Sequence, residues 1–472
     1  VEERWLADLR QYHSRYEPKF HSKLQAQSQT TGSSTIFVNQ TRPKCNMAES
    51  RVGDMLFPVD GRNWAADLPP NRWEGAEESP QGQQALDEAQ DRAKAMQAEI
   101  DDQLGDSDYN RKGRDAIHDA VVYGTGILRG PVTLDSTAKS WREIDAGVYE
   151  LNIVQDNRPG VLSVNVWDFF PDMSARSMHD CEFVFERDFL SRLEFQKLLK
   201  HPGYRETRQQ VKDALTAGPE STYMGSDRRQ EVRAISGVTS EAGRGRFERW
   251  RYHGPIQATL LTESGMEIDE EDDRDEIPVY CEFVGQYLIK FELLPLDTEE
   301  YPYSTFVWFQ ADETPFGFGI PWAMRSSQSA INSAWRAMLD NAALSAGPQV
   351  IIDENAIEPD DSGQWALSPR KVWRKLQSSV SKSVRDVFAV FDIPSFQPEL
   401  MEIYREAKQL ADEETNLPLI AQGQAPQVQQ TATQTSMQMN SANAVLRRIV
   451  KNWDDDVTKP LVTRFYDWNM QY

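Results

Sequence analysis

The sequence predicts an α+β fold in which helices occupy the two ends of the chain and strands occupy its middle. Apolar residues recur every three or four positions before residue 123 and again after residue 321, which is typical of amphipathic helices. Between them the period shortens towards two, which is typical of half-buried strands. The 472 residues leave room for about three domains, and 39% apolar residues with 13 Trp, 20 Phe and 15 Tyr support a folded core.

Four helices are expected in the N-terminal part of the chain. Their ranges are 2–28, 46–57, 83–104 and 108–123. The first carries an apolar stripe that includes Trp5, Leu9 and Phe20, and Pro18 is expected to bend it because proline lacks the amide donor. Asp108 is expected to cap the N-terminus of the fourth. A proline-rich, tryptophan-containing loop occupies 60–80.

The strand-rich middle begins at Thr125. The candidates are LNIV (151–154), VLSVNVWDFF (161–170), CEFVFERDF (181–189), FERWRYHGPI (247–256), VYCEFVGQYLIKFELLP (279–295) and YPYSTFVWFQ (301–310). Asn157–Gly160 is expected to break the first of these strands, because Asn, Pro and Gly favour turns. Two short helices are expected near 191–216, followed by a polar loop to 244. The last three strand candidates are expected to pair in one sheet.

Long helices return in the last 150 residues. The first begins at Pro321 and ends before Gly347, and the second runs from Pro398 to Asn416. A small β-containing insert at 349–395 separates them. A third helix, from about 435 to 472, is expected to kink at Pro460. The first helix carries one apolar stripe, formed by Met324, Ile331, Trp335, Met338 and Ala342.

Charge and cysteine content exclude several classes of protein. Lys plus Arg is 51 and Asp plus Glu is 74, and the net charge of −23 is too acidic for a protein that grips nucleic acid with its whole surface. The three cysteines are far apart and form no zinc-binding spacing, which favours a reducing, intracellular environment. The sequence contains no run of 18 apolar residues, so no membrane span is predicted, and the N-terminus does not resemble a signal peptide. Because Val1 is not an initiator methionine and the last segment stops within an apolar-periodic stretch, the native chain is expected to extend at both ends.

Motifs for catalysis and cofactor binding are absent or weak. Neither GxxxxGK[ST] nor GxSxG occurs, and the histidines show no metal-binding spacing. Gly124-Thr125-Gly126 has the wrong spacing for a dinucleotide loop and is interpreted as a tight turn. The SxxK match at 379–382 is a coincidence of four residues, and the acidic run 267–276 is interpreted as a solvated loop. We therefore expect no catalytic residue, no metal site and no cofactor.

Asp454-Asp455-Asp456 is the strongest candidate for metal chemistry. Paired carboxylates hold the ions in two-metal nucleases. On a helix, however, consecutive residues are rotated by about 100° from one another, so three in a row do not converge on one ion. A solvated or subunit-contacting helix face is the favoured interpretation.

Two segments have an unusual charge distribution. Residues 415–446 contain no charged side chain and are rich in Gln, Thr, Ser and Ala. This composition suits a flexible surface loop, and it equally suits a surface along which DNA passes without sticking. A basic patch is formed by Arg370, Lys371, Arg374, Lys375, Lys382 and Arg385. Such a patch is either a solvated face or a docking surface for an acidic partner or DNA.

Several segments of the sequence resemble segments of the portal proteins of tailed double-stranded DNA bacteriophages, of a short-tailed type. They are TRPKCNMAESRVGDMLFP (41–58), GTGILRGP (124–131), VWDFFPD (166–172), YPYSTFVW (301–308), FGFGIPWAMRSSQSAINSAWRAMLDNAAL (316–344), GPQVIID (347–353) and NWDDDVTKPLVTRFYDWNMQ (452–471). The order of predicted elements is similar too. The resemblance covers nearly the whole chain and is weakest across 60–105 and 200–245.

The resemblance implies a portal fold with named parts. The wing would be 1–320, an α+β body with N-terminal helices, and the two stem helices would be 321–345 and 397–415. The clip would be 346–396, the tunnel loop 416–434, and the long kinked helix of wing and crown 435–472. A C-terminal crown or barrel would lie beyond Tyr472.

The resemblance also implies a non-enzymatic function. The protein would form a ring, usually of twelve copies, at one capsid vertex of the virion, assembled in the cytoplasm of the host bacterium. The ring would be the conduit for packaging and ejecting double-stranded DNA. Its partners would be the terminase large subunit, whose ATPase supplies the force, the major capsid and scaffolding proteins, and the tail adaptor, with no membrane involved.

Three groups of site residues follow from this assignment. The DNA channel would be lined by Gln422, Gln424, Gln427, Gln429 and Gln430 of the tunnel loop. Terminase and adaptor would dock on Arg370, Lys371, Arg374 and Lys375 of the clip. Ring assembly would depend on Ile331, Trp335 and Met338. Two alternatives remain open: a structural adaptor of the tail machinery and a metal-dependent nuclease.

Overall fold

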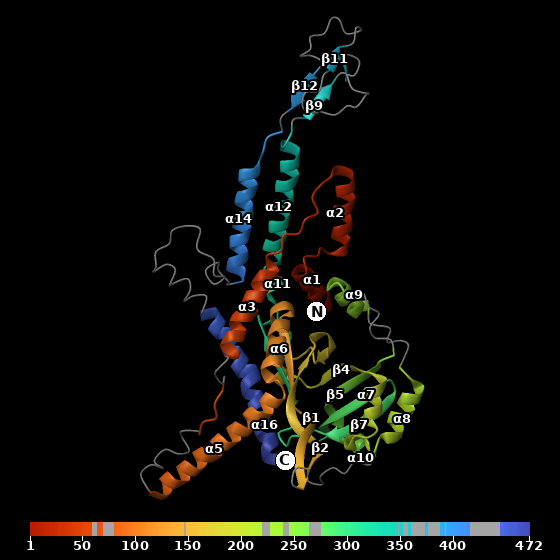
Figure 1. Cartoon of the computed structure of the whole chain (residues 1–472), viewed down its shortest axis with the longest axis vertical. Helices are drawn as coiled ribbons and strands as arrows, with labels where there is room; N and C mark the ends of the chain where they lie inside the picture. Colours follow the sequence, from red (N-terminus) through yellow and green to blue (C-terminus); the bar gives the residue numbers. More distant parts are fainter. Residues whose placement is uncertain are drawn as a thin grey trace. The chain divides into compact units, whose positions relative to one another are not determined.

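The computed structural model describes most of the chain as two compact units. The described residues are 1–58, 64–68, 80–145, 148–219, 227–238, 245–263, 275–347, 349–352, 357–359, 373–375, 388–391, 393–415 and 444–472. The first unit comprises Val1–Arg15, Asn39–Met324 and Glu413–Tyr472, and the second comprises Tyr16–Val38 and Arg325–Asp412. Figure 1 labels many of the helices and strands of both units.

The N-terminal segment forms two helices, not one bent helix as the sequence analysis predicts. Helix α1 is Glu2–Tyr12 and helix α2 is Pro18–Thr31. Between them Ser14 takes a left-handed φ of 62°, which ends the first helix. Pro18 occupies the first turn of α2, where its missing amide donor costs nothing.

Three further helices of the first unit match the predicted segments, with an earlier start for the first and longer bounds for the second. They are α3 (Thr41–Leu56), α5 (Pro80–Asp106) and α6 (Tyr109–Tyr123). Asp108 stands at the N-cap of α6, as predicted, but it has a left-handed φ of 56° and its side chain makes no capping hydrogen bond. Gly124 ends α6 with a φ of 100°, a conformation that glycine adopts without a steric penalty.

A three-stranded antiparallel sheet follows α6, in the order β2-β1-β8. Its strands are β1 (Thr125–Asp145), β2 (Val148–Val164) and β8 (Tyr303–Val307). The predicted break at 157–160 is wrong, because these residues continue β2 and pair with 132–135 of β1. Proline is tolerated there because β2 is an edge strand. Gly160 packs closely against Leu134, since a Cβ there would lie 2.3 Å from Leu134 Cδ1 and the leucine side chain would have to shift.

A five-stranded antiparallel sheet completes the strand-rich body. Its order follows the sequence, from β3 (Phe169–Pro171) and β4 (Val184–Leu190) through β5 (Phe247–Gln257) and β6 (Glu276–Val284) to β7 (Tyr287–Leu293). The prediction that 301–310 joins this sheet is wrong, because β8 pairs with β1. The 279–295 candidate forms two strands, which Gly285 joins with a φ of 57°.

Short helices cover part of the five-stranded sheet, as the sequence predicts for 191–216. They are α7 (Arg192–Leu198) and α8 (Arg208–Ala217). Phe195 and Val211 from these helices form one apolar cluster with Phe247 and Ile289 of the sheet. Helices α9 (Asp227–Ile235) and α10 (Ala258–Glu263) complete this region.

The C-terminal helical segment packs on the first unit. Residues 444–453 are helical, Asp454–Thr458 form a π-helical turn, and α16 is Lys459–Gln471. The sequence analysis predicts a kink at Pro460. The structure has the π-helical turn just before this residue, because a proline leaves the preceding turn without one amide donor. Trp453 is fully buried between the rings of Phe57 and Phe306.

The described part of the second unit contains three helices and four short strands. The helices are α2, α12 (Arg325–Ser345) and α14 (Gln397–Glu414), and Figure 1 shows α12 between the other two. The helix predicted from Pro321 is divided at Met324 into a single turn, α11 (Ile320–Ala323), and α12. The insert contains strands, as predicted. They form two antiparallel pairs, β9 (Gln349–Ile352) with β12 (Phe388–Phe391) and β10 (Ile357–Pro359) with β11 (Trp373–Lys375). The sequence segments QVIID and VFAVFDIP predict β9 and β12, whereas β10 and β11 are not predicted.

Candidate functional site

The residues predicted for ring assembly lie on α12. Ile331 and Met338 are 0% and 5% exposed, so both are already buried in a single chain. Trp335 is half-buried, and its ring lies 5.3 Å from that of Tyr404 on α14. Gln397 Nε2 also donates to the main-chain oxygen of Met338 at 2.6 Å. Helices α12 and α14 are therefore packed against each other along the second unit.

Helix α14 keeps an apolar stripe that the chain itself does not cover. Phe396, Ile403 and Leu410 are 53%, 51% and 48% exposed and are spaced seven residues apart, so they lie on one face. Tyr404 and Ala407, by contrast, are half-buried and buried. The sequence analysis predicts a second long amphipathic helix here, and the structure shows that only part of its apolar surface is buried in one chain.

A cluster of buried ion pairs, which the sequence analysis does not predict, joins the two sheets of the first unit. Arg129 of β1 donates to Glu186 of β4 at 2.6 Å, and the hydroxyl of Tyr303 in β8 donates to the same carboxylate at 2.8 Å. Arg251 of β5 bridges two carboxylates, with 2.7 Å to Glu186 and 2.6 Å to Asp188. We call this group the intersheet ion cluster.

The same cluster continues to strand β6. Arg249 lies 2.6 Å from Asp188 and 3.1 Å from Glu282. The hydroxyl groups of Tyr204 and Tyr280 both donate to the Glu282 carboxylate. Cross-strand register explains this arrangement, because residues 186 and 188 stand opposite 251 and 249, and 251 stands opposite 282.

The ionisation of the cluster follows from burial and pairing. Burial alone would raise the pKa of Glu282, but Arg249 and Arg251 overcome this effect and lower it from 4.5 to about 2. Burial, assisted by Arg129 and Arg251, lowers the pKa of His253 well below 6.5, so this histidine is neutral at pH 7. The cluster is a charge-balanced structural connection between the sheets, and its charged groups form ion pairs with one another.

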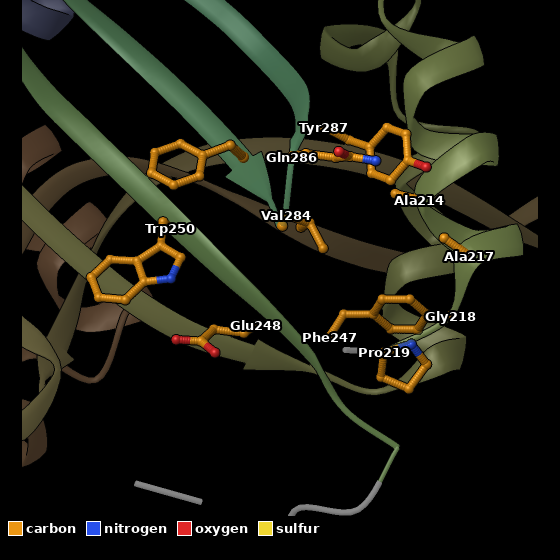
Figure 2. A pocket seen from close by; sticks show the side chains of 12 residues that line it. Ala214, Ala217, Gly218, Pro219, Phe247, Glu248, Trp250, Val284, Gln286 and Tyr287 are labelled. Carbon is orange, nitrogen blue, oxygen red and sulfur yellow. The ribbon is translucent and has the colours of Figure 1, made fainter. Parts of the chain in front are cut away.

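An open pocket of about 400 Å³ lies between α8 and strands β5 to β7. Figure 2 shows Glu248 and Trp250 on one side of it and Ala217, Gly218 and Pro219 on the other. Its described lining is mainly apolar and contains no histidine, cysteine or lysine. The Glu248 carboxylate lies 3.7 Å from Arg187. This lining offers no acid–base pair or nucleophile for catalysis.

The motifs considered for metal and phosphate binding have structural explanations. Asp454–Asp456 lie in the π-helical turn, and burial raises the pKa of Asp454 and Asp456. Among the residues described, no group of three or more His, Cys, Asp or Glu side chains is placed to hold a metal ion. Gly124-Thr125-Gly126 forms the junction of α6 and β1, which agrees with the interpretation as a tight turn.

The structure places the remaining predicted site residues only in part. Arg374 and Lys375 lie in β11, opposite Glu358 and Ile357 of β10. Arg370 and Lys371 lie outside the described residues, and so do all five tunnel-loop glutamines, the loop 416–434 and the SxxK match. No helix in the described portion of the chain has both the length and the apolar character needed to cross a membrane.

A family model matches the greater part of the chain. The model of the family described as Phage SU10 portal protein matches residues 76–472, which include both sheets, the α12 and α14 pair and the C-terminal helices. No curated protein matches the chain. The extent of the family match shows that the chain belongs to the phage SU10 portal protein family.

Proposed function

We propose that this portal protein forms a closed ring, usually of twelve copies, through which double-stranded DNA is packaged and ejected. The family match over residues 76–472 carries the proposal, since portal proteins are structural proteins of the phage capsid vertex. The exposed stripe of α14 supports it, because a helix face that one chain leaves uncovered is available to a neighbouring copy.

The proposal is tested by the native mass of the purified protein and by negative-stain images of particles viewed end-on. We expect rings with a central opening and a mass of about twelve chains. A monomer would contradict the proposal. Cleavage of plasmid DNA with Mg²⁺ or Mn²⁺, abolished by Asp455→Asn, would instead favour the nuclease alternative. Rings that bind finished heads but play no part in packaging would favour a tail adaptor.

Substitution of Trp335 is expected to reduce ring assembly. Trp335→Asp places an unpaired charge beside Tyr404, where α12 and α14 pack against each other. We expect native mass spectrometry to show a shift from rings to monomers. Arg405→Asp, on an exposed position of α14, is the control for a general effect of added acid. Assembly of Trp335→Asp at wild-type yield would rule out a stem role for this residue.

The insert between α12 and α14 is proposed as the docking site for the terminase large subunit and later for the tail adaptor. Its basic residues would attract an acidic partner and so raise the rate of association. Changing Arg370, Lys371, Arg374 and Lys375 to Glu is expected to leave ring assembly intact and to impair DNA packaging or tail attachment. Both would be measured in an in vitro packaging reaction and by counting tailed particles. Normal packaging together with normal tailing would refute the docking role.

The uncharged loop at 416–434 is proposed to face the channel. Amides and hydroxyls without fixed charge offer DNA no counterion release, so each phosphate is held only weakly. Changing Gln424, Gln427 and Gln429 to Lys is expected to make the ring hold DNA through ionic contacts. With three phosphates contacted by each subunit, the binding constant per subunit is expected to fall roughly 40-fold between 50 and 200 mM salt. The measurements are the packaging rate and DNA release at both salt concentrations. A wild-type packaging rate for the triple-Lys ring would contradict the proposal.

A further inference from the structure

The exposed edge of helix α2 is basic. No residue of α2 is buried, and Lys19 and Lys23 are both exposed. Between Pro18 and Thr31 there is no acidic residue, although the chain as a whole carries a net charge of −23. Phe20 lies on the same helix and is 42% exposed. This edge therefore combines positive charge with an exposed aromatic ring.

Helix α2 is held at a defined height along α12. The Arg336 guanidinium lies 5.3 Å from the centre of the Tyr16 ring and 5.6 Å from that of Phe20. After α2, the amide of Ser34 donates to Asp340 at 2.7 Å and the amide of Val38 donates to Asn332 at 2.8 Å. These contacts, which all lie within the second unit, fix α2 on one side of α12.

The opposite edge of the unit, on α14, has the complementary character. Its exposed stripe is formed by apolar residues at 396, 403 and 410. Glu399, Glu402 and Glu406 are exposed and lie roughly 40° to 100° around the helix from that stripe, on the side turned away from Tyr404. None of the three forms an ion pair with a described residue. This edge therefore combines negative charge with exposed apolar side chains.

The two edges stand at the same height along α12. Phe20 contacts Arg336, and Tyr404 contacts the preceding residue, Trp335. Ile403, next to Tyr404, is thus level with Phe20. In a ring whose axis is parallel to α12, the rotation that relates neighbours moves a subunit sideways without raising it, so groups at equal height on opposite edges would meet between neighbours.

We propose that the α2 edge of one subunit packs on the α14 edge of the next subunit. Phe20 would meet the stripe around Ile403, and Lys19 and Lys23 would pair with the glutamates that flank it. The contact is heterologous, with different surfaces on the two partners, so it repeats from copy to copy and closes into a ring. Within one chain α12 separates these edges (Figure 1). The inference rests on the proposed ring and names the surfaces that form it.

Cross-linking tests the contact directly. All three native cysteines are buried, so engineered cysteines are the accessible sites. In the chain with Lys23→Cys and Glu399→Cys, a short bismaleimide is expected to link subunits into a ladder that extends to the full ring. Either cysteine alone is expected to give no ladder. The inference is overturned if end-on images show rings while the double variant is cross-linked only within single chains or not at all.

Charge reversal gives a second, independent measurement. Changing Lys19 and Lys23 to Glu is expected to raise the protein concentration at half-assembly about tenfold, because like charges then face each other. Changing Glu399 and Glu402 to Lys in the same chain is expected to restore assembly to within about twofold of wild type. The matched control, Arg405→Glu with Lys408→Glu on the other side of α14, is expected to have little effect.

The outcomes separate this inference from the proposed ring function. Rings whose assembly is insensitive to the Lys19 and Lys23 reversal leave the portal ring in place and refute the α2–α14 contact. Failure of the combined four-residue reversal to restore assembly also refutes the pairing. A wild-type protein that stays monomeric refutes both the ring and the contact.

Discussion

Replacing Arg251 with methionine is expected to lower the free energy of unfolding of the first unit by about 3–5 kcal/mol. Arg251 lies within 2.7 Å of Glu186 and Asp188 and 3.5 Å from Glu282, and all of these groups except Asp188 are buried. The methionine fills a similar volume but leaves three carboxylates with only two arginines, Arg129 and Arg249, so one negative charge in a poorly solvated site is no longer balanced. Urea denaturation followed by tryptophan fluorescence measures the loss.

A surface ion pair supplies the matched control. Arg228 lies 3.5 Å from Glu2 and 3.6 Å from Glu231, and its side chain is partly exposed. Arg228→Met is expected to change the free energy of unfolding far less than Arg251→Met does, because solvent screens an exposed ion pair. Equal losses for the two variants would show that the intersheet ion cluster contributes no more than an exposed pair.

The intersheet ion cluster also predicts the response to acid. The pKa of Glu282 is lowered from 4.5 to about 2 in the folded protein. Its contribution to stability is therefore present above about pH 4.5 and is lost as the pH falls towards 2. In Arg251→Met the folded-state pKa of Glu282 moves back towards its ordinary value. The variant should consequently lose less additional stability over this pH range than the wild type.

The strand β5 illustrates how far the sequence predicts the fold. Within FERWRYHGPI, residues 249–253 alternate between basic and aromatic side chains, which predicts a strand but not which of its two faces is buried. Its aromatic residues, Trp250 and Tyr252, suit a core, yet Arg249 and Arg251 lie on the more deeply buried side. Only the register with β4 and β6 supplies the carboxylates that make this burial favourable, and register depends on long-range pairing.

The errors in the predicted fold have the same physical origin. Asn, Pro and Gly at 157–160 favour a turn locally, but pairing with β1 along an edge strand outweighs this preference. Strand β8 follows β7 in the sequence yet pairs with β1, nearly 180 residues earlier, which local periodicity does not record. Helices α12 and α14 were predictable from their apolar period, whereas the division of the α14 stripe into buried and exposed parts depends on tertiary packing.

Gly126 distinguishes the two interpretations of Gly124-Thr125-Gly126, which are a phosphate-binding loop and a tight turn. A phosphate-binding loop uses glycine so that the main chain approaches a ligand closely. In this structure the close approach is made by the protein itself. A Cβ on Gly126 would lie 1.9 Å from the main-chain oxygen of Ala116 in α6. Ala116 is buried in the core beside β1, so a methyl group at 126 would push directly against the main chain of α6.

Replacing Gly126 with alanine is therefore expected to lower the free energy of unfolding by at least about 3 kcal/mol, because α6 and β1 must separate to admit the methyl group. Gly53→Ala is the matched control. Gly53 lies inside α3, and a Cβ there has no neighbour within 4 Å, so alanine should stabilise the protein by about 0.5–1 kcal/mol. Chemical denaturation measures the two opposite shifts. A neutral Gly126→Ala would contradict the packing role and return this motif to the candidates for ligand binding.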